Sequence, residues 1–242
     1  MATNTERVKN MIVNSSRGKY NFTLRSHEED PSDSHDLDYK VINETWMENV
    51  YRIQKQHFDS SRVFVDIGAN IGSVSIYVDS FNKELRDHEK ITVFAVEPEP
   101  NNLQLLRSNL ASNPIQRITV VDKAIWYENK DVIISNKGGN SSIVYSSDVQ
   151  QTTVQAITLE NFFNIYGIRE VDVMKIDIEG AEFDLIINTP PEILAKIKYL
   201  TLEFDKSFDG KFGIMIEKLA KQFGIEILGS PERGGYIYAN RY

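Results

Sequence analysis

The sequence contains no cysteine among its 242 residues, which excludes disulfide bridges and thiolate metal sites and permits a cytoplasmic location. It also lacks any apolar run that approaches the roughly 18 residues typical of a membrane-spanning helix. The first residues show neither the basic start nor the apolar stretch of a secretion signal. We therefore expect a cytoplasmic protein with no membrane partner, whose Asn-x-Ser/Thr sequons stay unmodified.

Basic residues are in the minority, with 27 Lys and Arg against 35 Asp and Glu and a formal net charge of −8. A broad nucleic-acid surface normally shows basic clusters, so this balance argues against a nucleic-acid partner. It leaves open a small anionic acceptor in a local basic pocket. The length and the ordinary hydrophobic content of 41% suit one α/β domain with additions.

Segments that predict strands and helices alternate along most of the chain. We expect strands at 62–66, 92–97, 118–122, 171–177 and 199–203, and helices at 73–80, 101–111, 159–166, 181–196 and 211–223. Short β-like segments are expected within 131–157, and the segments 225–228 and 236–240 predict a terminal hairpin. The sequence therefore predicts an α/β fold: a Rossmann-like seven-stranded sheet with helices on both faces and a terminal antiparallel β-hairpin.

Residues 1–43 are expected to form a small N-terminal β/α extension ahead of a main domain at 44–242. Two strand-like segments, Met11–Val13 and Tyr20–Leu24, flank a Ser-Ser-Arg-Gly turn and predict a hairpin, which an acidic loop follows at 27–38. The main domain is expected to begin with a helix over 43–58, because apolar side chains recur there at helical spacing, at Trp46, Met47, Val50 and Ile53.

The segment Val63-Phe-Val-Asp-Ile-Gly-Ala-Asn-Ile-Gly72 predicts a buried strand that ends in an acid, a glycine turn and the start of a helix. Glycine permits positive φ and the close approach of a ligand, and the helix offers unpaired N–H groups. A dinucleotide-binding turn would require glycine at Asn70 and Ser73. Asp66 would repel a pyrophosphate but would favour the ammonium and sulfonium of S-adenosylmethionine. The segment resembles motif I of class I S-adenosylmethionine-dependent methyltransferases.

Carboxylates end four of the predicted strands, at Asp66, Glu97, Asp122 and Asp177. In an open parallel sheet, ligands lie beyond the carboxyl ends of the strands. Glu97 is suited to accept hydrogen bonds from both ribose hydroxyls, Asp122 from the adenine amino group, and Asp66 is expected near the methionine end. The predicted cofactor-binding residues are Asp66, Gly68, Asn70, Gly72, Glu97, Pro98, Asp122, Lys123, Ala124 and Asp177.

The segment Met174-Lys-Ile-Asp-Ile-Glu-Gly-Ala-Glu182 places charged residues in and after a core strand. Lys175 is costly to bury unless it is paired, so we expect it to reach a carboxylate or the substrate rim. Asp177, Glu179 and Glu182 form a dense acidic group, in which mutual repulsion can raise one pKa towards that of a useful base.

Three motifs together resemble the FkbM family of S-adenosylmethionine-dependent O-methyltransferases: Val65–Gly72, Val96-Glu-Pro-Glu-Pro-Asn101 and Lys175-Ile-Asp-Ile-Glu-Gly-Ala-Glu182. The resemblance spans roughly residues 44 to 205. It implies methyl transfer from S-adenosylmethionine to a hydroxyl of a small molecule or saccharide, helped by a base. The candidate catalytic residues are Asp177, Glu179, Glu203 and Lys175. Relatives often carry histidine after the last strand acid, whereas this chain has Glu203-Phe-Asp205, so an imidazole base is not expected.

Several alternatives stay open at this stage. Asp177 and Glu203 could instead hold a divalent cation through oxygen ligands. The chain could also be a non-catalytic S-adenosylmethionine-binding scaffold, a methyltransferase for amino groups or nucleic acid, or a nicotinamide dehydrogenase. The chain could also form a homo-oligomer. The acceptor cannot be identified from the sequence, although the segments 138–142 and 143–153 are expected to border its pocket.

Overall fold

The computed structural model describes residues 7–26, 37–137, 140–143, 151–207 and 209–242. The acidic loop expected at 27–38 and the acceptor border expected at 138–153 therefore lie largely outside the described residues. None of the helices in the described part of the chain is long and apolar enough to cross a membrane.

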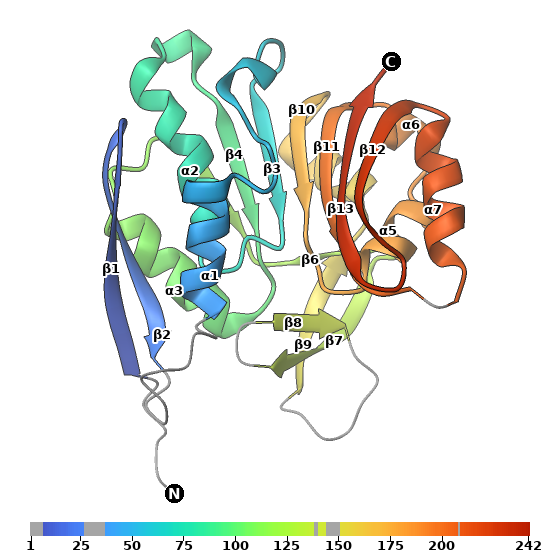
Figure 1. Cartoon of the computed structure of the whole chain (residues 1–242), viewed down its shortest axis with the longest axis horizontal. Helices are drawn as coiled ribbons and strands as arrows, with labels where there is room; N and C mark the ends of the chain where they lie inside the picture. The colour runs from blue at the N-terminus through green and yellow to red at the C-terminus, as the bar shows by residue number, and fades with distance from the viewer. Residues whose placement is uncertain (1–6, 27–36, 138–139, 144–150, 208) are drawn as a thin grey trace, which may run out of the picture.

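A seven-stranded sheet forms the centre of the molecule, in the order β12-β13-β11-β10-β3-β4-β5 (Figure 1). Neighbouring strands from β11 to β5 are parallel, whereas β13 runs antiparallel to both β11 and β12. The expected fold class and the antiparallel terminal hairpin are therefore confirmed. The strands span Val63–Ile67 (β3), Thr92–Val96 (β4), Ile118–Val121 (β5), Val171–Ile176 (β10), Ile197–Phe204 (β11), Phe223–Ser230 (β12) and Gly234–Arg241 (β13).

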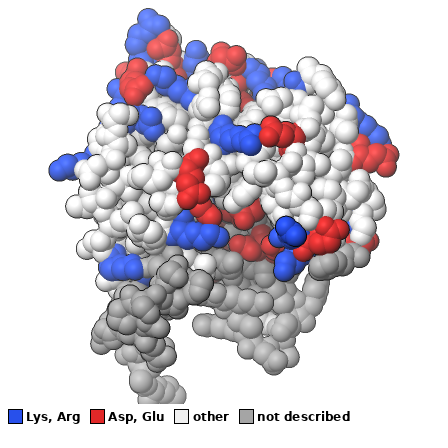
Figure 2. Space-filling model, in the orientation of Figure 1, with Lys and Arg blue, Asp and Glu red and all other residues white. Residues whose placement is uncertain are grey.

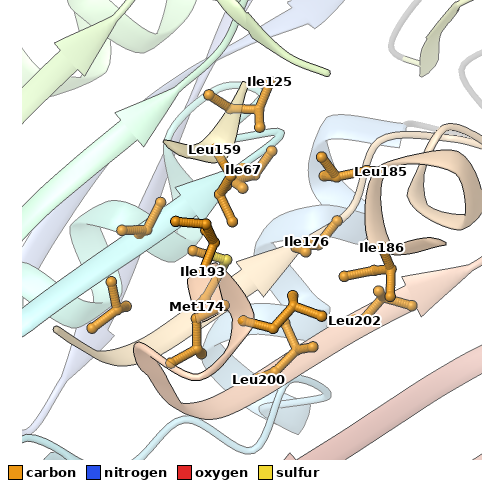
Figure 3. Close-up of a cluster of buried hydrophobic side chains, with 14 of the residues drawn as sticks. Ile67, Ile125, Leu159, Met174, Ile176, Leu185, Ile186, Ile193, Leu200 and Leu202 are labelled. Atoms are coloured by element: carbon orange, nitrogen blue, oxygen red, sulfur yellow. The ribbon is translucent and has the colours of Figure 1, made fainter. Parts of the chain in front are cut away.

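Helices cover both faces of this sheet because its central strands are apolar on both sides, and every residue of β10 is buried. One face packs against the helices α4 to α7, and the side chains between them form the largest core cluster (Figure 3). The other face packs against α2, α3 and the segment around Tyr51 to Phe58. The helices span Ser73–Asp79 (α2), Pro100–Ala111 (α3), Leu159–Tyr166 (α4), Glu182–Asn188 (α5), Pro191–Leu194 (α6) and Lys211–Ala220 (α7), with short 3₁₀ turns at Ser80–Glu84 and Asp87–Glu89.

A second, four-stranded sheet lies beyond one end of the central sheet, in the order β6-β9-β7-β8 (Figure 1). Its strands span Ala124–Ile125 (β6), Lys130–Lys137 (β7), Asn140–Ile143 (β8) and Gln151–Ile157 (β9). The sequence predicted short strands in this region but did not predict that they form a sheet of their own. This sheet brings β7 to the border of the cavity described below.

The N-terminal hairpin consists of β1 (Arg7–Ser15) and β2 (Gly18–Ser26), as expected from the Ser-Ser-Arg-Gly turn. One of its faces is apolar and packs with α1 (Leu37–Asn43), α2 and α3. Figure 1 shows the hairpin beside α3, on the side of the molecule opposite α7. The buried members of this cluster are Val13, Tyr20, Phe22, Leu24, Ile42, Ile71, Ile76 and Leu105.

The prediction of a helix over 43–58 is wrong. After α1 the chain makes one π-helical turn, Glu44–Glu48, and the helix ends at Asn49 with φ of 49°. An irregular segment follows, interrupted only by a 3₁₀ turn at Lys55–His57. The apolar spacing misleads because Ile53 reaches the core from irregular backbone, whereas Met47 is 60% exposed. Tertiary contacts, rather than a helical face, place these side chains.

Candidate active site

A cavity opens beyond the carboxyl ends of β3, β4 and β10, where the order of the parallel strands reverses. The turns that follow these three strands supply most of its lining, and Ile134 of β7 borders it from the small sheet. The predicted cofactor residues in the lining are Gly68, Asn70, Glu97, Pro98, Ala124 and Asp177. The cavity therefore collects the ends of the three motifs that the sequence singled out.

The glycine turn after β3 is held close to both neighbouring strands. The N–H groups of Gly68 and Ala69 donate to the carbonyl of Val96 at 3.0 and 2.9 Å. Gly68 has φ of +78°, and a Cβ at this position would lie 1.8 Å from the main-chain oxygen of Asp177. Only glycine fits here, because the obstacle is backbone that cannot rotate away. Gly72, by contrast, lies outside the lining and packs close to Leu106.

Glu97 is buried at the wall of the cavity and accepts hydrogen bonds from three groups of the chain. The main-chain N–H groups of Asn70 and Glu99 donate at 2.8 and 2.9 Å, and the Asn102 amide donates at 3.3 Å. Burial raises the pKa of Glu97 to about 7, although these hydrogen bonds oppose the rise. The carboxylate is therefore fixed in orientation at the end of β4.

Arg25 of the N-terminal hairpin holds the two asparagines that donate to Glu97. Its guanidinium donates to the side-chain oxygens of Asn102 at 2.7 Å and Asn70 at 3.2 Å. The guanidinium is itself paired with the buried carboxylate of Asp38 at the start of α1. This role could not be predicted from the sequence, because a single arginine at the end of a strand does not reveal partners so far along the chain.

Asp66 does not lie in the cavity, contrary to the expectation that it faces the methionine end. It is fully buried beneath the turn, where it accepts a hydrogen bond from Ser75 at 2.7 Å and pairs with the Lys175 ammonium at 3.2 Å. Lys175 also donates to the carbonyl of Gly68 at 2.6 Å and lies 3.4 Å from Asp177. Burial opposes its charge, but these two carboxylates raise the pKa of Lys175 above its usual range. The expected pairing of the lysine is therefore present.

Asp122 and Lys123 also lie outside the cavity lining. Asp122 is largely exposed and is 3.4 Å from Arg107, and the Lys123 ammonium donates to Gln155 of the small sheet. Of the three predicted cofactor residues in this segment, only Ala124 borders the cavity. The structure therefore does not bring the acid after β5 to the place where an adenine amino group was expected.

The candidate catalytic acids gather where β10 and β11 end. Asp177 and Glu179 line the cavity, and the phenol of Tyr51 lies 2.8 Å from Asp177 and 3.2 Å from Glu203. Burial and the charge of Asp177 raise the pKa of Glu203 to about 8 and that of Glu179 to about 7. Figure 2 shows acidic side chains near the middle of the face that it presents. Sequence reasoning found these acids but not Tyr51.

Glu182 has a structural place in this acidic group. It accepts hydrogen bonds from the main-chain N–H groups of Gly180 at 2.8 Å and Asp205 at 2.9 Å, and it is fully buried at the start of α5. Burial raises its pKa to about 7. Within the described residues, no group of three or more His, Cys, Asp or Glu side chains is placed to hold a metal ion.

Comparison with protein families shows that the model of the methyltransferase FkbM domain matches residues 66–238. The comparison with curated proteins found no match. Among solved structures, the chain is similar to an FkbM methyltransferase from Methylobacillus flagellatus KT, with 18% identity, a TM-score of 0.48 and coverage of 73% of this chain and 42% of that chain. The chain thus spans less than half the length of that protein.

Two further solved structures are similar over most of this chain. An rRNA methylase from Streptococcus thermophilus is 9% identical, with a TM-score of 0.47 and coverage of 89% of this chain and 99% of that chain. TrmK from M. capricolum, solved with S-adenosylhomocysteine, is 13% identical, with a TM-score of 0.45 and coverage of 80% of this chain and 66% of that chain.

Proposed function

The chain belongs to the FkbM family of methyltransferases, and we propose that it transfers the methyl group of S-adenosylmethionine to a hydroxyl of a small molecule or saccharide. The observation that carries this proposal is that Glu97 and Asp177 line one cavity, at the ends of β4 and β10. One carboxylate is suited to hold a nucleoside, and the other is suited to receive a proton beside it. A single cavity thus offers both requirements of methyl transfer.

The donor side fits S-adenosylmethionine by its chemistry. A carboxylate can accept more hydrogen bonds than the three that Glu97 receives from the chain, so ribose hydroxyls can still donate to it. The absence of a side chain at Gly68 lets the turns after β3 and β10 approach each other at the cavity, since a Cβ would meet the Asp177 main chain at 1.8 Å. The carboxylates of Asp177 and Glu179 favour a cationic sulfonium. When bound, the donor supplies an electrophilic methyl group.

The acceptor side supplies the base. Methyl transfer to an alcohol is an in-line displacement that depends on positioning, and the hydroxyl proton must be removed as the new bond forms. Asp177 is the candidate that lines the cavity and is also hydrogen-bonded to a second acid through Tyr51. We assign the proton transfer to Asp177 together with Glu203. Lys175, which is buried and paired with Asp66 and Asp177, orients Asp177.

The first experiment is calorimetry on the full chain with S-adenosylmethionine, S-adenosylhomocysteine and NAD. We expect the first two to bind and NAD not to bind; tight binding of NAD alone would reject the proposal. The second experiment offers labelled S-adenosylmethionine together with a panel of saccharides, small alcohols and matched amines. Label on a hydroxyl supports O-methylation, whereas label that appears only on amines rejects it.

A further inference from the structure

Tyr51 places one phenol between two carboxylates that end neighbouring parallel strands. Its oxygen lies 2.8 Å from Asp177, which follows β10, and 3.2 Å from Glu203 near the end of β11. Only 7% of Tyr51 is exposed. The residue also precedes the part of the chain that the family comparison matches, which begins at residue 66. The phenol therefore comes from a residue outside the segment that the family model matches.

The hydroxyl hydrogen of Tyr51 has two acceptors within reach, the carboxylates of Asp177 and Glu203. A phenol has a single O–H to donate, so it cannot satisfy two ionised carboxylates at the same time. The consistent arrangement has a proton on one of them: Glu203 donates to the phenol oxygen, and the phenol donates to Asp177. The opposite arrangement, with the proton on Asp177, uses the same three oxygen atoms. These oxygens form a short chain along which a proton can move.

The backbone around Tyr51 is held in an uncommon conformation that fixes the phenol. Asn49 and Arg52, on either side, have positive φ angles of 49° and 53°. The Tyr238 hydroxyl of β13 donates to the carbonyl of Val50 at 2.6 Å, and Arg52 lies over the Tyr238 ring at 3.9 Å. Two non-glycine residues in the left-handed region within four positions cost free energy, and such strain gathers at functional sites.

We propose that Tyr51 is a positioning residue that joins Asp177 and Glu203 into a single base, with Glu203 as the final site of the proton. This inference rests on the proposed function. As the acceptor oxygen bonds to the methyl carbon, the carbon–sulfur bond breaks and its electron pair stays on sulfur. In the reactive form Glu203 has first released its proton to solvent, and the phenol donates to Glu203. The hydroxyl proton then passes to Asp177 and from there to the phenol oxygen, while the phenol gives its own proton to Glu203. The phenol is restored, and Glu203 releases the proton to solvent afterwards.

The charged surroundings support Glu203 as the site that holds the proton. Glu203 lies close to other acids, and burial and the charge of Asp177 raise its pKa to about 8. Burial first, and then the neighbouring acids, raise the pKa of Tyr51 well above its usual value, so the phenol keeps its hydrogen in the resting state. The titratable groups that interact electrostatically with these three side chains include Lys175, Glu179, Tyr236, Tyr238, Glu44, Asp205 and Asp66.

The test is carbon-13 NMR of the side-chain carboxyls in the full chain with S-adenosylhomocysteine present, titrated from pH 5 to 10. Asp177→Asn and Glu203→Gln assign the two signals by their loss. In the parent chain we expect both carbons to shift in a shared step near pH 8, because one proton is common to both. In Tyr51→Phe, which removes only the phenol oxygen, the Asp177 response in that step is expected to disappear, and Glu203 is expected to titrate at higher pH.

Tyr199→Phe is the matched control, since Tyr199 is a buried tyrosine of the same core cluster whose ring packs on His57. It should leave the shared step in place. A shared step that survives in Tyr51→Phe overturns the inference, and so does a parent chain in which the two carbons titrate independently. If Tyr51→Phe does not fold, Glu203→Gln decides instead, because it should remove the Asp177 response near pH 8.

Calorimetry with S-adenosylhomocysteine separates the two proposals: absence of binding rejects the proposed function and leaves the carboxyl titration interpretable.

Discussion

The carboxylates on the two sides of the cavity differ in how many hydrogen bonds the chain gives them. Glu97 alone accepts two main-chain N–H groups and one amide, whereas Asp177 and Glu203 share one phenol. A carboxylate held by several donors keeps its orientation and can bind a ligand without reorganising. A pair that shares one hydrogen has two arrangements of the proton. We infer from this difference that one side of the cavity is suited to hold a ligand and the other to move a proton.

The largest expected effect comes from Gly68→Ala, because Gly68 lies where the two sides meet. The new Cβ would lie 1.8 Å from the Asp177 main-chain oxygen, so β3 and β10 would have to separate. We expect the free energy of unfolding to fall by about 3 kcal/mol or more, measured by urea denaturation. Gly167→Ala is the matched control, since Gly167 also has positive φ of +65° but no atom within 4 Å of the added Cβ.

That control separates the cost of the close contact with Asp177 from the cost of the left-handed backbone conformation. Gly167→Ala should cost only about 1–2 kcal/mol, the penalty of left-handed backbone for an alanine. Equal losses in the two variants would show that the close approach of Gly68 to Asp177 is relieved at little cost. The two sides of the cavity would then be less tightly connected than the structure indicates.

The next largest effect is expected on turnover, from Asp177→Asn and Glu203→Gln. Each variant removes a proton acceptor on the acceptor side while the hydrogen bonds to Glu97 stay intact. With a hydroxyl acceptor that supports turnover of the parent chain, we expect the rate of S-adenosylhomocysteine formation to fall by about 100-fold or more. The dissociation constant for S-adenosylhomocysteine should change by less than about threefold. Parental turnover in both variants would place the base elsewhere, and Glu160→Gln, an exposed acid on α4, is the control.

A smaller effect is expected on cofactor affinity, through Glu97. Its pKa is raised to about 7, so below that pH it is increasingly protonated and accepts ribose hydrogens less well. The dissociation constant for S-adenosylhomocysteine should therefore rise as the pH falls from 8 to 6, as measured by calorimetry. Glu97→Gln imitates the protonated form and should weaken binding at pH 8 by about 1–3 kcal/mol, the scale of a hydrogen bond to a charged group.

The same variant is the control for the pH dependence. In Glu97→Gln the dissociation constant should change much less between pH 6 and 8, because the group that titrates is gone. If the variant keeps the full pH dependence, another acid controls binding, and Glu179, whose pKa is also raised to about 7, is the one to replace next. The contrast between a binding side and a proton-moving side would then have to be abandoned.

The sequence predicted the features that depend on residues close together in the chain. It did not reveal contacts between residues that are far apart in the chain. The central strands and the glycine turn follow from apolar runs that end in an acid, so Glu97 and Asp177 could be assigned to one edge of the sheet. Arg25 and Tyr51 could not be found in this way. The guanidinium of Arg25 contacts a residue 77 positions away, and the phenol of Tyr51 contacts one 126 positions away. Only the packing of the hairpin and the irregular segment after α1 reveals them.

The smallest effect is expected from replacing Asp122. This variant tests whether the sequence pattern, an acid after a strand, or the position of the side chain in the structure predicts cofactor binding. Asp122 ends β5 as Glu97 ends β4, yet its side chain is 62% exposed, lies outside the cavity lining and pairs only loosely with Arg107 at 3.4 Å. Asp122→Asn should change the free energy of unfolding by no more than about 0.5 kcal/mol, as expected of an exposed ion pair. Its dissociation constant for S-adenosylhomocysteine should stay within about twofold of the parent. A tenfold loss would mean that the side chain turns inward when the nucleoside binds, and that two strand-end acids, rather than one, hold it.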